Sequence, residues 1–150
     1  MTTVPDPTAE HPNAALLREF YDAFGAADRD RLGRLLAPDV VWHFPGTSPI
    51  SGDWVGVDGL LGGIRAVAMA MGQGRNSFEL LHVTGGAGFA ITVHRDTYSG
   101  EGNHLDLRYA LYCRIVDGRI VEVFEVPFDQ AENDRYFAVQ AAALARAAGA

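Results

Sequence analysis

The second half of this chain contains four strand-like segments in succession with no helical pattern between them, and this run constrains the fold most. The segments cover residues 77–84, 88–98, 105–116 and 119–128, and glycine-rich turns separate them. The dipeptide Asp117-Gly118 before the last segment is typical of a two-residue hairpin turn. Consecutive strands joined by such short turns predict an antiparallel meander.

Apolar periodicity predicts helices on both sides of this meander. Over residues 14–27 the apolar side chains recur at i, i+3, i+4 and i+7, the stripe of an amphipathic helix, at Leu17, Phe20, Tyr21 and Phe24. A short helix over 28–36 and a longer one over 57–71 follow, and an alanine-rich helix over 129–147 ends the chain. A strand over 40–44 and an irregular loop that contains Trp54 lie between the second and third helices.

This order of elements predicts one α+β domain. Its N-terminal helices pack on one face of a curved, mostly antiparallel sheet. A curved sheet closed by helices forms a cone, and we expect the cone to enclose an apolar pocket. We expect a flexible, proline-rich arm over residues 1–12, the folded domain over 13–136 and a helical tail over 137–150.

Composition and charge limit the classes of partner. The chain has 150 residues, 48% of them hydrophobic, which suits a single domain. Its formal net charge of -7 disfavours nucleic acid and anionic membranes as partners. No apolar run approaches the roughly 18 residues of a membrane span, and the amino end lacks the pattern of a signal peptide, so we expect a cytoplasmic protein. The single cysteine, Cys113, excludes an internal disulfide and fits a small buried apolar residue.

Two segments, APDVVWHFPGTSPISGDWVG and VDGRIVEVFEVPFDQAE, carry a family resemblance together with the order of the elements. They resemble the SnoaL-like polyketide cyclase group of the nuclear transport factor 2-like (NTF2-like) superfamily, which also contains ketosteroid isomerases and limonene epoxide hydrolases. The resemblance covers about residues 14–136 and implies a cone with its pocket between the concave sheet face and the helices. It also implies a homodimer paired through the opposite face. Since the superfamily holds enzymes, binding proteins and scaffolds, function must be argued from the pocket lining.

Strand alternation predicts which side chains face that pocket, because residues two apart share a face. In the segment 105–116 the apolar set is predicted to face inward: Leu105, Leu107, Tyr109, Leu111, Cys113 and Ile115. In the segment 119–128 composition alone favours the even-numbered set, with Phe124 inward. Comparison with the ketosteroid isomerase pattern, anchored on the hairpin turn, instead favours Val121, Val123 and Glu125, and we adopt this register. Glu125 is then a carboxylate against apolar walls, where desolvation raises the pKa toward the range useful for acid–base work. The alternative is a solvent-facing Glu125.

The same comparison places His94 and Asp96 inward on the segment 88–98. The pair resembles, with His in place of Arg, the Arg-x-Asp of the epoxide hydrolases, in which a further Asp near the position of Glu125 activates water. Together these residues would set an imidazole between two carboxylates that exchange protons with it. A surface His–Asp pair near a strand end is the alternative. The histidine spacings do not match a metal site and the chain has no thiolate cluster, so we expect no metal, with a facial triad of His94, Asp96 and Glu125 as the alternative.

Departures from the family patterns are equally informative. Phe20, Phe44 and Leu111 stand where the ketosteroid isomerases carry their catalytic polar groups, which disfavours steroid isomerisation by that arrangement. In the epoxide hydrolases polar residues orient the attacking water, and the corresponding positions in this chain are near Trp42 and Phe44. The water would therefore lack its usual partners, which makes the hydrolase hypothesis weaker than the leading one. Aromatic side chains are predicted to line the pocket instead: Phe20, Phe24, Trp42, Phe44 and Trp54, with Tyr109 and Leu111 beside them. Tyr109 would bond either a ligand or the protein, and His43 is predicted at the rim or outside.

The leading hypothesis is therefore a cofactor-independent acid–base enzyme acting on a small apolar oxygenated molecule by cyclisation, isomerisation or dehydration. Glu125, His94 and Asp96 are its candidate catalytic residues. An epoxide hydrolase and a non-catalytic ligand-binding protein are the alternatives, and a dimeric interaction module with a filled pocket is a further one. We also expect a homodimer through the convex sheet face, where Arg108, Tyr112 and Arg114 offer the arginine and aromatic residues enriched at interfaces.

Overall fold

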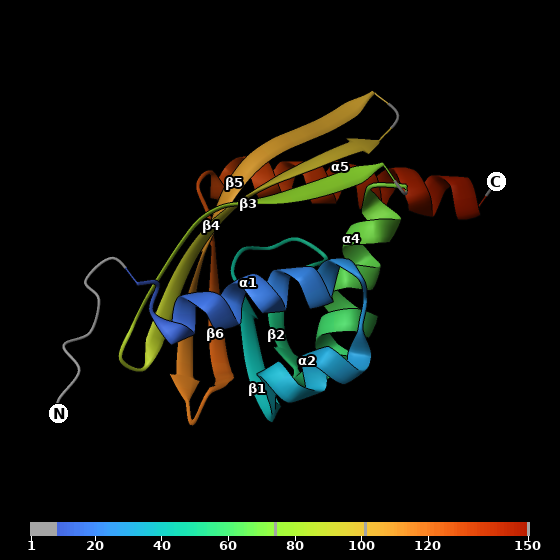
Figure 1. The fold of residues 1–150 in the computed structure, drawn as a ribbon. Helices are drawn as coiled ribbons and strands as arrows, with labels where there is room; N and C mark the ends of the chain where they lie inside the picture. The colour runs from blue at the N-terminus through green and yellow to red at the C-terminus, as the bar shows by residue number, and fades with distance from the viewer. Residues whose placement is uncertain (1–8, 74, 101, 150) are drawn as a thin grey trace, which may run out of the picture.

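The computed structural model describes residues 9–73, 75–100 and 102–149 as an α+β domain built on one six-stranded sheet (Figure 1). Its helices are α1 (Pro12–Gly25), α2 (Arg29–Leu35), α3 (Gly56–Asp58), the π-helix η1 (Gly59–Arg65), α4 (Ala66–Met71) and α5 (Gln130–Ala148). Its strands are β1 (Leu36–Phe44), β2 (Gly52–Val55), β3 (Asn76–Gly86), β4 (Phe89–Gly100), β5 (Asn103–Val116) and β6 (Arg119–Pro127). Residues 1–8 of the predicted arm lie outside the described part of the chain.

The predicted meander is confirmed, and one further pairing completes the sheet. The strand order is β2-β1-β6-β5-β4-β3, with antiparallel pairing along β3 to β6. The first strand runs parallel to the last, and Trp42 of β1 pairs with Val123 of β6. Figure 1 shows the long strands β3, β4 and β5 curving over α1, with α4 beside the end of α1. This arrangement is the α+β cone that the sequence predicted.

The inward faces follow the predicted alternation in β5. Its odd-numbered side chains from Leu105 to Ile115 are all buried, whereas the charged residues between them are exposed. In β6 the register taken from the family comparison is confirmed for Val123 and Glu125, because both are buried. The register favoured by composition is wrong, since Phe124 is 41% exposed on the outer face.

Val121 departs from the predicted register. The pairing of β5 with β6 shifts between Arg114 and Ile115, so that Ile115 pairs with Ile120 while Arg114 pairs with Glu122. Such an irregularity breaks the two-residue alternation. Ile120 is therefore fully buried, and Val121 is only half-buried.

Trp54 was predicted in an irregular loop, and this was wrong. The chain reverses after β1, and residues 52–55 form β2, in which Trp54 pairs with Trp42 of β1. The indole nitrogen of Trp54 donates to the carbonyl of Ile50 at 2.9 Å. Its ring packs against η1 at Gly63, where an added Cβ would lie 2.3 Å from Trp54 Cε3. Only glycine therefore allows this close approach between helix and ring.

The third predicted helix is present over the expected range but is not regular. It begins as α3, widens into the π-helix η1 and ends as α4. Segments of π-helix are rare and are frequently found at functional sites. In this protein η1 forms one side of the cavity described below.

The last helix, α5, begins at the N-cap Asp129, whose side chain accepts from the Glu132 backbone N–H at 3.0 Å. Tyr136 and Phe137 of α5 are buried against the domain. The predicted division between residues 136 and 137 falls inside this helix and stays a prediction. Within the described ranges, no helix combines the length and the apolar character needed to cross a membrane.

Candidate active site

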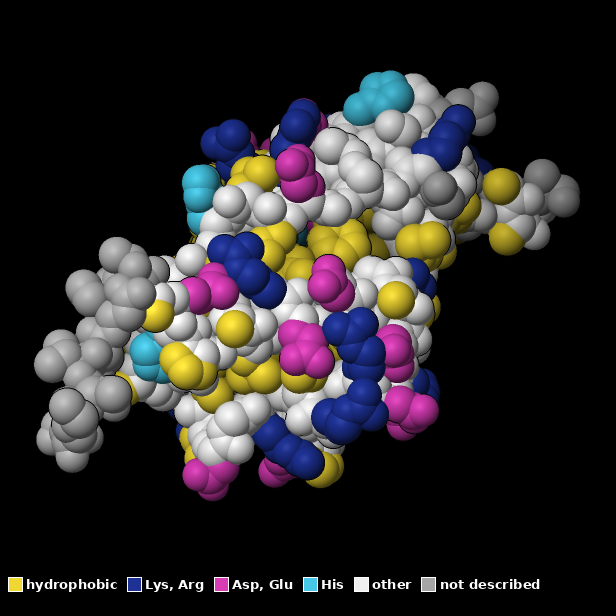
Figure 2. Space-filling model, in the orientation of Figure 1, with side chains coloured by type: hydrophobic (Ala, Val, Ile, Leu, Met, Phe, Trp, Pro, Cys, Tyr) yellow, Lys and Arg dark blue, Asp and Glu magenta, His cyan; other side chains and the backbone are white. Residues whose placement is uncertain are grey.

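A cavity of about 280 Å³ lies inside the cone, close to the lower end of the roughly 300–1,000 Å³ typical of small-molecule sites. Its walls come from α1, η1 and α4 on one side and from the inward faces of the strands on the other. Nine of the lining residues are aromatic, namely Phe20, Tyr21, Phe24, Trp42, Phe44, Phe78, Tyr98, Tyr109 and Phe137. Figure 2 shows hydrophobic side chains in a hollow between the strands and α1.

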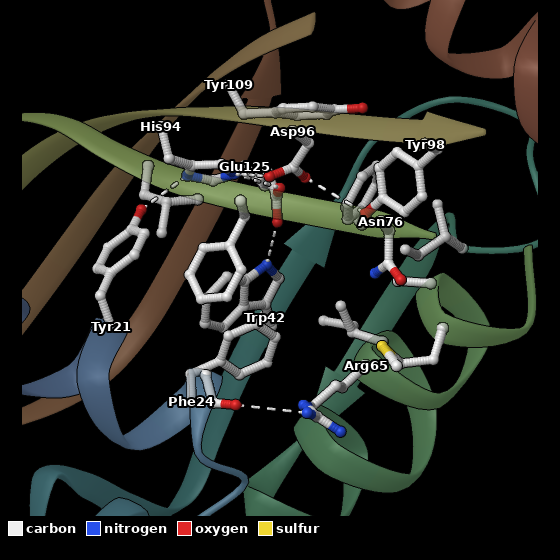
Figure 3. A pocket seen from close by; sticks show the side chains of 18 of the residues that line it. Tyr21, Phe24, Trp42, Arg65, Asn76, His94, Asp96, Tyr98, Tyr109 and Glu125 are labelled. Atoms are coloured by element: carbon white, nitrogen blue, oxygen red, sulfur yellow. Dashed lines mark hydrogen bonds and ion pairs between the residues drawn. The ribbon is translucent and has the colours of Figure 1, made fainter. Parts of the chain in front are cut away.

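Three ionisable side chains meet in this aromatic cavity (Figure 3). His94 and Asp96 come from β4, and Glu125 comes from β6. The imidazole Nε2 of His94 lies 3.6 Å from Asp96 Oδ1 and 3.7 Å from Glu125 Oε1. Each of the three residues is less than one-tenth exposed, at 6%, 8% and 6% for His94, Asp96 and Glu125. The predicted arrangement of an imidazole between two inward carboxylates is therefore present.

Strand register explains how residues distant in sequence meet here. Leu111 of the intervening strand β5 pairs with Glu125 on one side and with Thr92 on the other. His94, two residues beyond Thr92, shares its face and pairs with Tyr109. The side chains of His94 and Glu125 therefore approach each other over the inward face of β5.

Each of the three ionisable groups is held by an aromatic neighbour. The indole nitrogen of Trp42 donates to Glu125 Oε2 at 2.7 Å. Tyr98 Oη donates to Asp96 Oδ2 at 3.3 Å. Tyr21 Oη lies 2.7 Å from His94 Nδ1 and 2.8 Å from Thr92 Oγ1. These bonds leave His94 Nε2 and one oxygen of each carboxylate directed at one another.

Burial and charge shift the acidity of this group. Burial raises the pKa of Glu125 to about 7, although His94 and the Trp42 hydrogen bond act in the opposite direction. Burial lowers the pKa of His94, but Asp96 and then Glu125 raise it more, so the imidazole has a pKa above its ordinary value. The raised pKa of His94 favours its charged form, and this imidazole lies beside a Glu125 carboxyl that is able both to release and to accept a proton near neutral pH.

Two buried acceptors along the cavity are unsatisfied. Asp96 Oδ1 and Asn76 Oδ1 have no hydrogen-bond donor among the described residues. Buried polar atoms are normally hydrogen-bonded, and leaving one unpaired costs about 1–3 kcal/mol. Both residues line the cavity, so a donor on a molecule inside it would reach these buried oxygens after a small movement of the side chains.

The side chains predicted to line the pocket are found there with one exception. The cavity is lined by Phe20, Phe24, Trp42, Phe44, Tyr109 and Leu111. Trp54 does not, because the β1–β2 hairpin carries it behind η1. The hydroxyl of Tyr109 donates to Asn133 Oδ1 at 2.7 Å, so it is satisfied by the protein.

His43 lies outside the cavity, as predicted. It is on the outer sheet face, where its two ring nitrogens lie 2.7 Å from Asp53 Oδ1 and 2.9 Å from Glu122 Oε2. Its ring stacks on Phe124, with 4.6 Å between the centroids.

Comparison with known proteins supports the resemblance seen in the sequence. A model of the SnoaL-like domain matches residues 17–123, more than half of the chain. The chain belongs to the SnoaL-like family. An uncharacterized protein of Mycobacterium tuberculosis is 31% identical over 124 residues, covering 82% of this chain and 94% of that protein.

Solved structures share this fold. Bal32a, from a soil-derived mobile gene cassette, has a TM-score of 0.76 and 28% identity, over 84% of this chain and 96% of that one. An NTF2-like protein from Burkholderia xenovorans has a TM-score of 0.71 over 86% of this chain and 98% of that one. At 13% identity, the second likeness shows the fold alone.

The sequence patterns did not predict four further residues that line the cavity: Tyr21, Arg65, Asn76 and Tyr98. Tyr21 was assigned only to the apolar stripe of the first helix, and its hydroxyl contact with His94 depends on how that helix crosses the sheet. Tyr98 shares a strand face with Asp96, so alternation alone could have predicted it. Asn76 and Arg65 carry no sequence signal of their own.

Proposed function

We propose that this SnoaL-like protein is a cofactor-independent acid–base enzyme that acts on a small, largely apolar, oxygenated molecule. The reaction would be a cyclisation or isomerisation, in which a proton is removed from one position of the substrate and returned at another, or a dehydration, in which the hydroxyl takes up the proton and leaves as water. The observation that carries this proposal is the buried group of His94, Asp96 and Glu125 in a cavity whose walls are otherwise largely apolar and rich in aromatic side chains.

Glu125 is the proposed proton-transfer group. A carboxyl with a pKa of about 7 is well matched to accepting and returning a proton at neutral pH. The Trp42 N–H occupies Oε2, which leaves Oε1 for the substrate. In this proposal Glu125 removes a proton from the substrate and gives it back at a second position, which in a dehydration is the hydroxyl that leaves as water.

His94 and Asp96 would stabilise the charge that this transfer creates. A protonated His94 beside Glu125 favours the carboxylate form at the start of the reaction, and its Nε2–H is also a donor for a developing enolate or alkoxide oxygen. The free oxygen of Asp96 would accept from a substrate hydroxyl. The aromatic walls supply binding energy for an apolar, ring-containing body.

Two alternatives belong to other classes. An epoxide hydrolase is supported by the His94-x-Asp96 pair with Glu125, but Phe44 provides no polar atom for the water and the Trp42 indole nitrogen already bonds Glu125. A non-catalytic binding protein would use the same carboxylates only to satisfy ligand hydroxyls. The products distinguish these alternatives from the acid–base enzyme, since a hydrolase forms a diol from an epoxide and a binding protein forms no product.

Proton exchange at carbon tests the proposal without knowledge of the natural substrate. The wild-type protein is expected to accelerate the exchange of α-hydrogens of β-tetralone for deuterium in heavy water, followed by NMR. A binding protein would perturb the ketone signals without raising the exchange rate. Formation of a diol from styrene oxide would favour the hydrolase. Failure to accelerate exchange with β-tetralone, indanone or cyclohexenone would contradict acid–base catalysis.

We further propose that two copies of the chain pair through the outer sheet face. Apolar side chains there are well exposed, with Ile91 at 39%, Tyr112 at 45%, Phe124 at 41% and Val126 at 51%. Arg108 and Arg114 flank them on β5, which matches the arginine and aromatic content of interfaces.

Light scattering at micromolar concentration is expected to give the mass of a dimer. The Val126→Glu variant should shift the protein toward monomer, because it buries a charge in the contact. Val139→Glu is the matched control, since Val139 is 44% exposed on α5, away from this face. A wild-type monomer, or equal effects of the two variants, would contradict this interface.

A further inference from the structure

We propose that the substrate is an amphiphilic organic carboxylate whose charged group binds Arg65 at the mouth of the cavity, while its apolar body enters the aromatic interior. This inference rests on the proposed function, because it specifies the substrate class of the same site.

Arg65 belongs to the cavity by its position in the helix. Ile64, Arg65, Ala68 and Met69 all line the cavity. Arg65, Ala68 and Met69 follow Ile64 by one, four and five residues, and this spacing places the four side chains on one face of the η1–α4 segment. Trp54 packs against the Gly63 backbone from another side of η1, so this face is directed at the cavity while its back is closed by the indole ring.

The guanidinium of Arg65 has few partners among the residues that the structure describes. Arg65 Nη2 donates a hydrogen bond to the backbone carbonyl of Gly25 at 3.4 Å. No carboxylate among the described residues lies within 4.0 Å of it. A guanidinium carries five N–H donors in a planar fork that suits a carboxylate, so most of this capacity is unused.

The surroundings of Arg65 suit a ligand with both an apolar and a charged part. Met69 and Phe78, which also line the cavity, are 38% and 37% exposed and give its opening an apolar rim. Figure 3 shows Arg65 on the side of the cavity opposite the group formed by His94, Asp96 and Glu125. A ligand held at Arg65 would therefore extend across the aromatic interior toward that group.

Electrostatics would fix the direction of entry. Asp96 and Glu125 disfavour a second anion at the inner end, because like charges in a low-dielectric site repel strongly. The protein as a whole carries a formal charge of -7 and therefore repels anions. The guanidinium of Arg65 is a positive charge at the opening of the cavity, where it attracts an anion locally. A carboxylate at Arg65 would hold the opposite, oxygenated end of the substrate at Glu125 and at the free oxygen of Asp96.

Binding measurements with paired probes test this assignment. The probes are the para-hydroxyphenyl derivatives of propanoic, butanoic and pentanoic acids, each compared with its own methyl ester by isothermal titration calorimetry. At least one acid is expected to bind the wild type about tenfold more tightly than its ester, since a charge-assisted pair at a half-exposed site contributes on the order of 1–2 kcal/mol. Added salt should reduce this ratio.

Variants separate Arg65 from the general charge of the protein. Arg65→Gln should bring the acid-to-ester ratio close to one, and Arg65→Lys should retain part of it. Arg119→Gln removes the same charge from an exposed position in the β5–β6 hairpin region and should keep the wild-type ratio. Thermal unfolding checks that each variant is folded, and the wild-type ratio tests the inference even if Arg65→Gln is not.

Equal affinity of acid and ester in the wild type, or equal losses in Arg65→Gln and Arg119→Gln, would overturn the carboxylate subsite. Failure of every acid and ester to bind would overturn it as well. These outcomes concern affinity and require no turnover. Acid-selective binding without proton exchange would instead reject the acid–base function and leave the subsite in place.

Discussion

The Glu125→Gln variant is expected to lower the rate of substrate proton transfer by on the order of 10²–10⁴-fold, the usual contribution of a positioned general acid or base. Glutamine has nearly the same shape and is still able to accept the Trp42 hydrogen bond that holds Glu125 Oε2 at 2.7 Å. It has no ionisable oxygen. Ligand affinity should therefore change little, and the loss should appear in kcat.

The matched control for this variant is Glu122→Gln. Glu122 lies on the same strand but bonds His43 on the outer face, so the same chemical change is made away from the cavity. Turnover by Glu122→Gln should equal that of the wild type. Near-normal kcat in Glu125→Gln would show that another group transfers the proton, and equal losses in both variants would point to a structural effect.

The second large effect concerns stability, which should fall as the pH rises from about 5 to 8. The folded pKa of Glu125 is about 7, against 4.5 for the ordinary side chain, so the folded state binds this proton more tightly than the unfolded state does. The resulting stabilisation is fully present below pH 4.5 and is lost as the pH passes 7. Its size is at most about 3 kcal/mol, from 1.36 kcal/mol for each pKa unit.

His94 contributes in the same direction. Its folded pKa is raised, so its protonation stabilises the protein below about pH 6.5 and this stabilisation fades as the pH passes the folded value. Since His94 and Glu125 interact, the two should titrate as a coupled set. The pKa of His43 is also raised, first through its hydrogen bond to Glu122, and its effect has the same sign.

Urea unfolding at pH 5 and pH 8 measures this dependence. The decline in the free energy of unfolding should shrink by more than half in a His94→Gln, Glu125→Gln double variant. The His43→Gln variant is the control, because it removes only the contribution from the outer face. Superimposable curves for the wild type and the double variant would contradict the burial of this group.

Part of the fold and of the candidate site followed from local sequence patterns. The hairpin turn at Asp117-Gly118 and the alternation from Leu105 to Ile115 determined the meander and its inward face, because turn geometry and the two-residue period are local properties. Composition alone misassigned β6, where Phe124 and Val126 are exposed on the outer face and Glu125 is buried. An exposed apolar strand face and a buried one have the same alternation of apolar residues in the sequence. Only comparison with the family therefore predicted which face of β6 points inward.

Tertiary structure alone decided how the candidate site is assembled. The parallel pairing of β1 with β6 places the Trp42 indole beside Glu125, and the crossing of α1 places the Tyr21 hydroxyl beside His94. The β1–β2 hairpin removes Trp54 from the predicted lining and packs it behind η1, whose inner face carries Arg65 to the cavity mouth. The contacts of Trp42 with Glu125 and of Tyr21 with His94 join residues more than seventy positions apart, and all of these contacts depend on strand order and helix packing, which no local period in the sequence encodes.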